Sequence, residues 1–585
     1  MKRIVLYIAK NNRKRITVLF LLSFISGITV PFITSYESEL VNAVTSLLGT
    51  DVSVIDLVPI VTMLAFLYLL SYLIPNFIQY QEGLLYPDLD RLVKEPLISN
   101  VENRKYEILE DPLFVDKWNR IMDKMDDKLK ELLPTVFGLT TTSISVFGML
   151  IYVLKESREI ALLYSLILIA LFYESKKAAN ALYTLNKKFT STERRIMYMN
   201  NITNKKEYIQ ERKIFNYTPF VNTKRIDFMY KERIEQKNID FKFAFLSALV
   251  EASGYIATII VMIIMFSQLK ANSITIGFFI AFSRATLTLN NTMQYKVKNK
   301  LDIIAQQRIF WSEFWELVNT EKTEINKDFI LPQVPFRSLE FRNVSFSYPN
   351  GTEVLKDISF KIESDKHYAL VGENGCGKST IVKLILGFYE PTKGKILLNG
   401  KSIQRYSQES LTKYFSVVFQ DFAQYAVTFK ENITLGNIVD KEVYDDTVLS
   451  VGLAAVKNKL PYRDDTILGR IENTGVDLSG GEWQKAAMAR ALCKQSEFVI
   501  LDEPTASMDP IAESNMYSQF NSLMRNRGTI FISHRLASAT LADKIFVIKD
   551  KKVCESGTHQ ELINQRGYYY IMFNMQKKWY WKENM

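Results

Sequence analysis

The spacing of apolar residues divides the 585-residue sequence near position 300. Before that point, six apolar stretches meet the length needed to cross a bilayer as helices, although the fourth is short. They lie at about 16–36, 57–80, 132–154, 159–175, 241–268 and 273–292. The pattern predicts an α-helical transmembrane domain with six spans over residues 1–312.

Charged residues around these stretches indicate how the chain is oriented. The segment 37–56 contains four acidic residues and no Lys or Arg, whereas 174–242 contains 16 Lys and Arg against 8 Asp and Glu. Cytoplasmic segments of membrane proteins collect Lys and Arg. Both termini and 174–242 are therefore predicted to lie in the cytosol, with the chain spanning the cytoplasmic membrane among its lipids. The net charge of +10 has the same explanation, and no nucleic-acid partner is expected.

The segments 81–131 and 174–242 are long, charged and poor in Gly and Pro. Unstructured loops of this length are uncommon inside a protein. We therefore expect the transmembrane helices to continue beyond the membrane in both places.

Two ionisable residues fall inside predicted spans, Glu251 in FLSALVEASGYIA and Arg284 in FFIAFSRATLTL. Ionisable groups at membrane depth usually face a protein interior or a water-filled cavity. One hypothesis places either or both on the path of a transported substrate. The alternative, that Glu251 lies among cytoplasmic headgroups, remains equally open.

After a polar linker at 313–336, short apolar runs alternate with tight turns and helical segments. The run HYALVG, the loop GENGCGKST and the helical TIVKLILGF match the pattern GxxxxGK[ST] in its strand–loop–helix setting. Backbone N–H groups of such a loop surround nucleotide phosphates at a helix N-terminus. Lys378 is predicted to reach the terminal phosphates and Ser379 to ligate Mg²⁺. The predicted ATP-binding residues of this loop are Gly372, Glu373, Asn374, Gly375, Cys376, Gly377, Lys378, Ser379 and Thr380.

A second apolar run, FVIL, precedes the acidic pair Asp502 and Glu503. A wholly apolar run is typical of a strand that is buried on both faces of a parallel sheet. Asp502 is then placed at the strand end, where it can hold Mg²⁺, and Glu503 can activate the water that attacks the γ-phosphate. His534 follows a further apolar run, FIS, and is the other catalytic candidate.

Cys376 lies within the phosphate loop. The start of a helix lowers the pKa of a thiol and so favours the thiolate. The alternative is that a small residue is simply tolerated between glycines. The three cysteines form no CxxC pair and no metal-binding cluster with His, so reduced thiols in the cytosol are expected.

The sequence LSGGE is a second glycine-rich segment at a predicted helix start. Its serine and glycine N–H groups suit a γ-phosphate. A plain helix N-cap with two flexible glycines is the alternative interpretation. The segment consists of Leu478, Ser479, Gly480, Gly481 and Glu482.

With these motifs in this order, residues 337–575 resemble the nucleotide-binding domain of an ATP-binding-cassette (ABC) transporter, followed by a tail at 576–585. The resemblance implies an α/β P-loop domain with a helical subdomain, ATP and Mg²⁺ as cofactors, and LSGGE contacting the ATP of a partner chain. Tyr348 in FSYPNG resembles the aromatic residue that stacks on adenine, and Gln420 in VVFQDF resembles the glutamine that contacts Mg²⁺. Asp509 in ASMDP resembles the aspartate that communicates between the two ATP sites. Because every motif is intact, a homodimer is favoured.

Six spans ahead of one cassette resemble an exporter half-transporter. The segments 110–120 and 206–220 are similar to the cytoplasmic helix tips that dock on cassettes in that family. Trp483 in GGEWQKAAMARAL resembles the exporters of lantibiotics and related ribosomal peptides. No peptidase domain is expected ahead of the first span. ATP-driven peptide export is therefore predicted, with a lipid or multidrug exporter, or an importer of siderophore-like compounds on the exporter fold, as alternatives.

Overall fold

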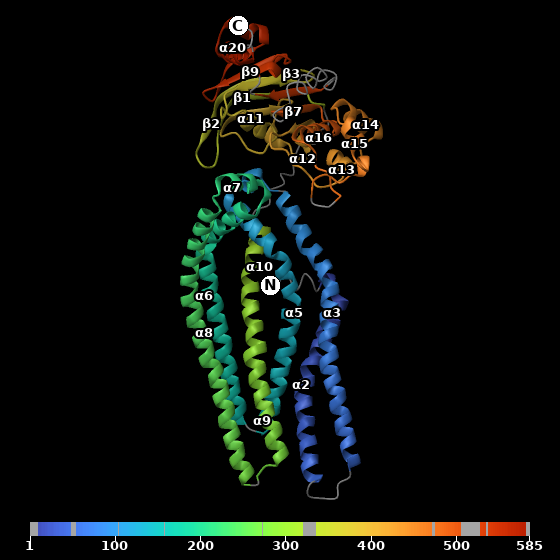
Figure 1. Ribbon diagram of the computed structural model, residues 1–585, viewed down its shortest axis with the longest axis vertical. Helices are drawn as coiled ribbons and strands as arrows, with labels where there is room; N and C mark the ends of the chain where they lie inside the picture. Colours follow the sequence, from blue (N-terminus) through green and yellow to red (C-terminus); the bar gives the residue numbers. More distant parts are fainter. Residues whose placement is uncertain are drawn as a thin grey trace. The chain divides into compact units, whose positions relative to one another are not determined.

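The structure is a computed structural model of the chain and divides into two compact units. The first unit comprises Met1–Arg104 and Asp111–Lys322, and the second comprises Lys105–Glu110 and Thr323–Met585. Figure 1 shows both. The described residues are 10–47, 54–102, 104–156, 158–271, 273–319, 335–470, 474–504, 527–533 and 536–580.

Long helices that run alongside one another build the first unit (Figure 1). They are α2 (Arg13–Leu47), α3 (Val58–Glu102), α5 (Pro112–Glu156), α6 (Arg158–Asn204), α8 (Thr218–Lys270), α9 (Ile276–Asn291) and α10 (Lys298–Asn319). Short elements join them: η1 (Val54–Leu57), η2 (Lys206–Tyr208), α7 (Ile209–Phe215) and the π-helical segment η3 (Thr292–Val297). The segments predicted to extend beyond the membrane are indeed helical over most of their length.

Among the residues that the structure describes, four helical stretches of this unit are long and apolar enough to cross a membrane. They are Arg13–Thr45, Val58–Glu102, Pro112–Lys155 and Phe241–Lys270. The prediction of six spans is not confirmed, because the stretches at 159–175 and 273–292 are not among them. The apolar part of α6 is short and has Arg158 and Glu159 at its start, and α9 has only 16 residues before η3 begins.

The helices of the first unit pack around two apolar clusters. One joins α2, α3, α5 and α10, where Trp311 is fully buried, and the other joins α5, α6, α8 and α9. Helices approach closely where a small residue faces a bulky one. At Gly148 of α5, an added Cβ would lie 2.6 Å from Cγ of Pro31 in α2. By contrast, large apolar side chains such as Phe147 and Leu166 are 68% and 65% exposed, as expected for surfaces that face lipid.

The second unit contains two sheets. A four-stranded antiparallel sheet has the order β2-β1-β4-β5, and a six-stranded sheet has the order β10-β9-β3-β8-β7-β6. In the larger sheet all neighbours pair in parallel except β10, which pairs antiparallel with β9 at one edge. The strands are β1 (Ser338–Ser347), β2 (Glu353–Glu363), β3 (His367–Gly372), β4 (Lys393–Leu398), β5 (Lys401–Ser402), β6 (Phe415–Val418), β7 (Phe498–Asp502), β8 (Gly528–Ile532), β9 (Lys544–Lys549) and β10 (Lys552–Gly557).

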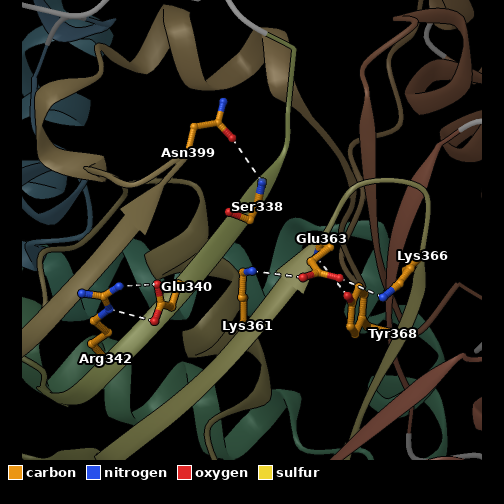
Figure 2. Close-up of polar contacts among 8 residues, drawn as sticks. All are labelled: Ser338, Glu340, Arg342, Lys361, Glu363, Lys366, Tyr368 and Asn399. Atoms are coloured by element: carbon orange, nitrogen blue, oxygen red, sulfur yellow. Dashed lines mark hydrogen bonds and ion pairs between the residues drawn. The ribbon is translucent and has the colours of Figure 1, made fainter.

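Polar contacts join the antiparallel sheet to its surroundings (Figure 2). The backbone N–H of Ser338, at the start of β1, donates to Oδ1 of Asn399 in the turn after β4 at 3.1 Å. Glu363, at the end of β2, accepts from Lys361 and Lys366, and its backbone N–H donates to the hydroxyl of Tyr368 in β3 at 2.9 Å. The exposed ion pairs here add little stability. The backbone contacts fix where β1 and β2 begin and end.

Helices cover both faces of the six-stranded sheet. They are α11 (Lys378–Ile385), α12 (Gln408–Tyr414), α13 (Phe429–Thr434), α14 (Lys441–Ser450), α15 (Ala454–Lys459), α16 (Gly480–Cys493), α18 (Leu536–Ala539), α19 (His559–Gln565) and α20 (Tyr568–Tyr580), with the 3-10 turns η4 (Ile403–Arg405) and η5 (Arg463–Asp465). A short helix, α4 (Tyr106–Leu109), also belongs to this unit. Successive residues of a strand point to opposite faces. Accordingly, Ala369 and Val371 of β3 enter the cluster with α16, whereas Tyr368 and Leu370 enter the cluster with α11.

Candidate nucleotide site

The loop between β3 and α11, residues 372–380, curls around one buried ammonium group; we call it the phosphate loop. Lys378 is 6% exposed, and its Nζ donates to the carbonyl oxygens of Gly372 and Glu373 at 2.8 and 2.9 Å. Gly375 and Gly377 have φ angles of +78° and +104°, which favour glycine. The loop therefore places a cation and the N-terminus of an eight-residue helix together, an arrangement that suits an anion.

Two carboxylates stand at the end of β7, beside this loop. Asp502 is 5% exposed, and this burial raises its pKa, while a hydrogen bond with the Ser379 hydroxyl and the nearby Lys378 oppose the rise. Glu503 has a left-handed backbone (φ +49°), held by a hydrogen bond from its N–H to the carbonyl of Ile532 at 2.9 Å. Left-handed non-glycine residues are strained, and such strain is common at functional sites.

Two glutamine side chains also hold Glu503 in place. Its carboxylate accepts from Nε2 of Gln420 at 2.9 Å, and its carbonyl accepts from Nε2 of Gln484, in α16, at 3.2 Å. The ends of β3 and β7 and the segment after β6 thus meet at the carboxyl edge of the sheet. Parallel sheets bind ligands at this edge.

The donor set at this edge fits a magnesium ion. The Ser379 hydroxyl, the Asp502 carboxylate and the Gln420 amide all offer oxygen, which Mg²⁺ prefers. The sequence interpretation named these three residues, and the structure brings Ser379 to Asp502 and Gln420 to Glu503.

The predicted adenine-stacking residue, Tyr348, lies next to the phosphate loop. Its hydroxyl is 3.0 Å from Oγ1 of Thr380, and its ring meets the Tyr389 ring edge-on at 5.4 Å between centroids. The ammonium of Lys383, in α11, lies 5.9 Å from the Tyr348 centroid, within reach of a cation–π interaction.

Sequence reasoning missed the residues that surround Lys383. Its ammonium pairs with Glu110 at 2.7 Å, and Glu110 also accepts from the hydroxyls of Tyr389 and, at 2.8 Å, Tyr106. Burial opposes ionisation of Glu110, but these three donors outweigh it and lower its pKa. Tyr106 stacks on Phe388 at 4.4 Å. Glu110 is the first residue of the predicted tip at 110–120, and no motif marks it as a partner of Lys383.

The segment LSGGE forms the N-terminus of α16. The backbone N–H of Glu482 donates to the Ser479 hydroxyl at 3.4 Å, and the Glu482 carboxylate accepts from the Ser479 N–H at 2.8 Å, which is a complete capping box. Ser479 and Gly480 are exposed, whereas Leu478 is 8% exposed. The N-cap interpretation therefore describes the structure, in which Glu482 accepts the Ser479 N–H and Gly480 is exposed.

The remaining predicted site residues have mixed outcomes. Asn374 and Gly375 are exposed in the loop. Burial raises the pKa of the Cys376 thiol despite the nearby Lys378, so the expected preference for thiolate is wrong in direction. His534 and Asp509 lie outside the described residues.

In the first unit, the two charges predicted to lie within spans have ionic partners. Nζ of Lys298, in α10, is 3.1 Å from Glu251, and Arg284 is 3.0 Å from Glu37 of α2. Glu37 also accepts from the hydroxyl of Tyr68 in α3. Glu37 lies just after the first predicted span, at 16–36, but α2 continues to Leu47, and the pairing of Glu37 with Arg284 explains how a charge is accommodated in the helix.

Comparison with known proteins agrees with this geometry. The family model described as "ABC transporter" matches residues 355–506. The subtilin transport ATP-binding protein SpaT of Bacillus subtilis is 30% identical over 555 residues, covering 92% of this chain and 88% of that protein. The nisin transport ATP-binding protein NisT of Lactococcus lactis subsp. lactis is 35% identical over 54% of this chain and 53% of its own length.

Other similarities are to part of the chain or to the fold alone. The human mitochondrial iron-sulfur clusters transporter ABCB7 is 40% identical over 42% of this chain and 32% of that protein. A solved structure of a bacterial Atm1-family ABC exporter with ATP bound has a TM-score of 0.78 and 22% identity, covering 96% of this chain and 98% of that one. The chain belongs to the ABC transporters: it is a membrane protein with the exporter fold that hydrolyses ATP to drive transport.

Proposed function

We propose that this chain exports a ribosomally made, lantibiotic-like peptide across the cytoplasmic membrane. The observation that carries the proposal is the similarity to the subtilin transport protein, because it extends over 92% of the chain and so includes the helical unit. The similarity to ABCB7 covers 42% of the chain. In a transporter, the membrane helices contact the cargo, whereas the cassette is common to many cargoes.

For the membrane topology, we propose six spans with both termini and the cassette in the cytosol. The excess of Lys and Arg over 174–242 supports this orientation. The four long apolar helices account for four spans. The other two, the fourth and sixth in chain order, lie on α6 and on α9 with η3, and they return 174–242 and the cassette to the cytosolic side.

We assign the ATP site by chemistry. The N–H groups of the phosphate loop and Lys378 bind the triphosphate, and Tyr348 stacks on the adenine. Ser379, Asp502 and Gln420 hold Mg²⁺, which neutralises charge on the phosphates when bound. Glu503 orients or deprotonates the attacking water. His534 and Asp509 keep the roles that the family resemblance implies.

Hydrogen bonds at the candidate site support these roles. Lys378 binds two backbone carbonyls, and Gln420 binds the Glu503 carboxylate. A bound triphosphate would offer Lys378 a stronger, charged acceptor. Gln420 would hold the ion through its amide oxygen, while its Nε2 keeps the Glu503 carboxylate in place to activate the water.

The exposed start of α16 supports a homodimer. Each chain has a phosphate loop and an LSGGE segment, and two chains facing head to tail would complete two ATP sites. ATP then holds the cassettes together, and hydrolysis releases them to reset the membrane helices for alternating access.

The cargo is tested in the producing cell. Deleting the gene should abolish extracellular peptide and retain the peptide inside the cell, and a plasmid copy should restore secretion. A copy with Glu503→Gln should fail, whereas Glu442→Gln, which changes an exposed carboxylate of α14, should restore secretion. Normal peptide secretion after deletion would exclude the proposal. Loss of lipid or drug efflux, or of siderophore uptake, would favour the alternatives.

A further inference from the structure

The C-terminal helix α20 contacts the phosphate loop. The hydroxyl of Tyr568, the first residue of α20, donates a hydrogen bond to the carboxylate of Glu373, the second residue of the loop. The two residues are separated by 195 positions in the sequence. Glu373 is exposed, so water can solvate its carboxylate and no hydrogen bond is required to offset desolvation.

Several contacts fix Tyr568 where it is. The Glu555 carboxylate, in β10, accepts from the backbone N–H groups of Tyr568 and Tyr569, the latter at 3.0 Å. The Glu555 carboxylate packs against Gly567, where the Cβ of any other residue would collide with it. Tyr569 is fully buried, and its hydroxyl is 2.8 Å from Nδ1 of His559.

The ring of Tyr568 is held as well. Nζ of Lys549, at the end of β9, lies 4.3 Å from the ring centroid. Lys549 follows Ile548, which pairs with Gly372 at the entry to the phosphate loop. The hydrogen bond to Glu373, followed by burial, raises the pKa of Tyr568 to about 12. The hydroxyl therefore keeps its proton and stays a donor throughout the physiological range.

Stability alone does not account for this contact. A hydrogen bond between exposed side chains contributes little to folding. The position of the hydrogen bond suggests another role, because Glu373 is an acidic residue within a loop that binds a polyanion. A carboxylate free to turn toward the triphosphate would repel it and offset part of the attraction of Lys378.

We propose that Tyr568 is a positioning residue of the ATP site, whose hydroxyl holds the Glu373 carboxylate beside α20 and away from the incoming triphosphate. The loop then presents its N–H groups and Lys378 to the nucleotide without an opposing charge. This role is independent of the cargo.

The test is steady-state ATP hydrolysis by the full-length chain in lipid nanodiscs. Tyr568→Phe removes the hydroxyl and keeps the ring over Lys549. It should raise KM for ATP ~3- to 10-fold with little change in kcat, because one screened charge acts on the bound triphosphate. The matched control is Tyr570→Phe, two residues further along α20, which should leave both constants unchanged. Unchanged KM in Tyr568→Phe, or a loss confined to kcat, would overturn the proposal.

A second variant separates positioning from general structure. Glu373→Gln removes the charge, so adding Tyr568→Phe to it should have no further effect on KM. A KM that rises as much in this background as in the wild type would contradict the proposal. The KM ratio of Tyr568→Phe to wild type should also shrink toward one as salt is raised from 50 mM to about 500 mM. A ratio that does not change with salt would point to a structural defect instead.

Discussion

Replacing Glu110 by Ala should release residues 105–110 from the rest of their unit. The carboxylate accepts from the Lys383 ammonium at 2.7 Å, from the Tyr106 hydroxyl at 2.8 Å and from the Tyr389 hydroxyl. Without it, Lys383 loses its counter-ion, and two tyrosine hydroxyls lose their acceptor. The contacts that remain include the Tyr106–Phe388 stack, the edge-on contact of Tyr106 with Tyr389 and the Lys105–Glu390 ion pair at 3.1 Å.

The size of the effect follows from the exposure of the pair. A hydrogen bond to a charged group contributes about 1.5–3 kcal/mol when buried. The side chains of Glu110 and Lys383 are 38% and 27% exposed, so solvent screens much of each interaction. A total of about 2–3 kcal/mol for the three bonds is then reasonable. At about 1.4 kcal/mol per tenfold change, the equilibrium between bound and released segment shifts by about 30- to 150-fold.

Amide hydrogen exchange measures this shift directly. In α4, the N–H of Ile108 bonds to the carbonyl of Lys105, and that of Glu110 to Tyr106. A four-residue helix does not persist without tertiary contacts. Exchange over 105–110 should therefore accelerate about 30- to 150-fold in Glu110→Ala. The control, Glu107→Ala, changes an exposed carboxylate in the same short helix. Equal exchange in both variants would refute the reasoning.

The same contact should respond to acid. Because the folded pKa of Glu110 is lowered, its contribution is fully present above the ordinary carboxylate pKa near 4.5. It is lost as the pH falls below that value and through the lowered folded pKa. Protection of 105–110 in the wild type should accordingly persist at pH 5 and decline in more acidic buffer. Protection that falls already between pH 7 and pH 5 would assign the effect to another group.

Three further predictions concern the remaining sites. Glu503→Gln should lower kcat for ATP by about 10²- to 10⁴-fold while nucleotide binding persists, and near-normal turnover would show that Glu503 is not the base. Maleimide should label Cys376 slowly at pH 7 and faster as the pH approaches its raised pKa, with ATP protecting; mass spectrometry of the labelled peptide checks both. Arg284→Gln leaves Glu37 without its ionic partner, and it should change substrate-stimulated ATPase while basal ATPase persists; unchanged stimulation would remove Arg284 from the substrate path.

Local patterns in the sequence predict the strands, the loop and the helix that carry the candidate nucleotide site. The order of strand, glycine loop and helix identified β3, the phosphate loop and α11, and the run FVIL identified β7. Each of these elements can be predicted from neighbouring residues. The conformational freedom of glycine determines the loop, and a continuous apolar run over a few positions determines a buried strand. The positions of Asp502 and Glu503 at the strand end follow in the same way.

Contacts between distant segments could not be predicted in this manner. Glu110 and Lys383 are 273 residues apart, and Glu373 and Tyr568 are 195 apart. Their pairing depends on how whole helices and strands pack against one another, and no sequence motif around either residue predicts that packing. Similarly, the first predicted span ends before Glu37, yet Glu37 pairs with Arg284, far along the sequence, and α2 continues through it to Leu47.

ATP-dependent peptide uptake by inside-out proteoliposomes tests the central claim most directly. Vesicles that contain the purified chain should accumulate a lantibiotic-class peptide with ATP and Mg²⁺. They should accumulate none with the Glu503→Gln variant or without nucleotide. Accumulation of a lipid or drug probe, but not of the peptide, by the same ATP-hydrolysing vesicles would contradict the assignment of a peptide cargo.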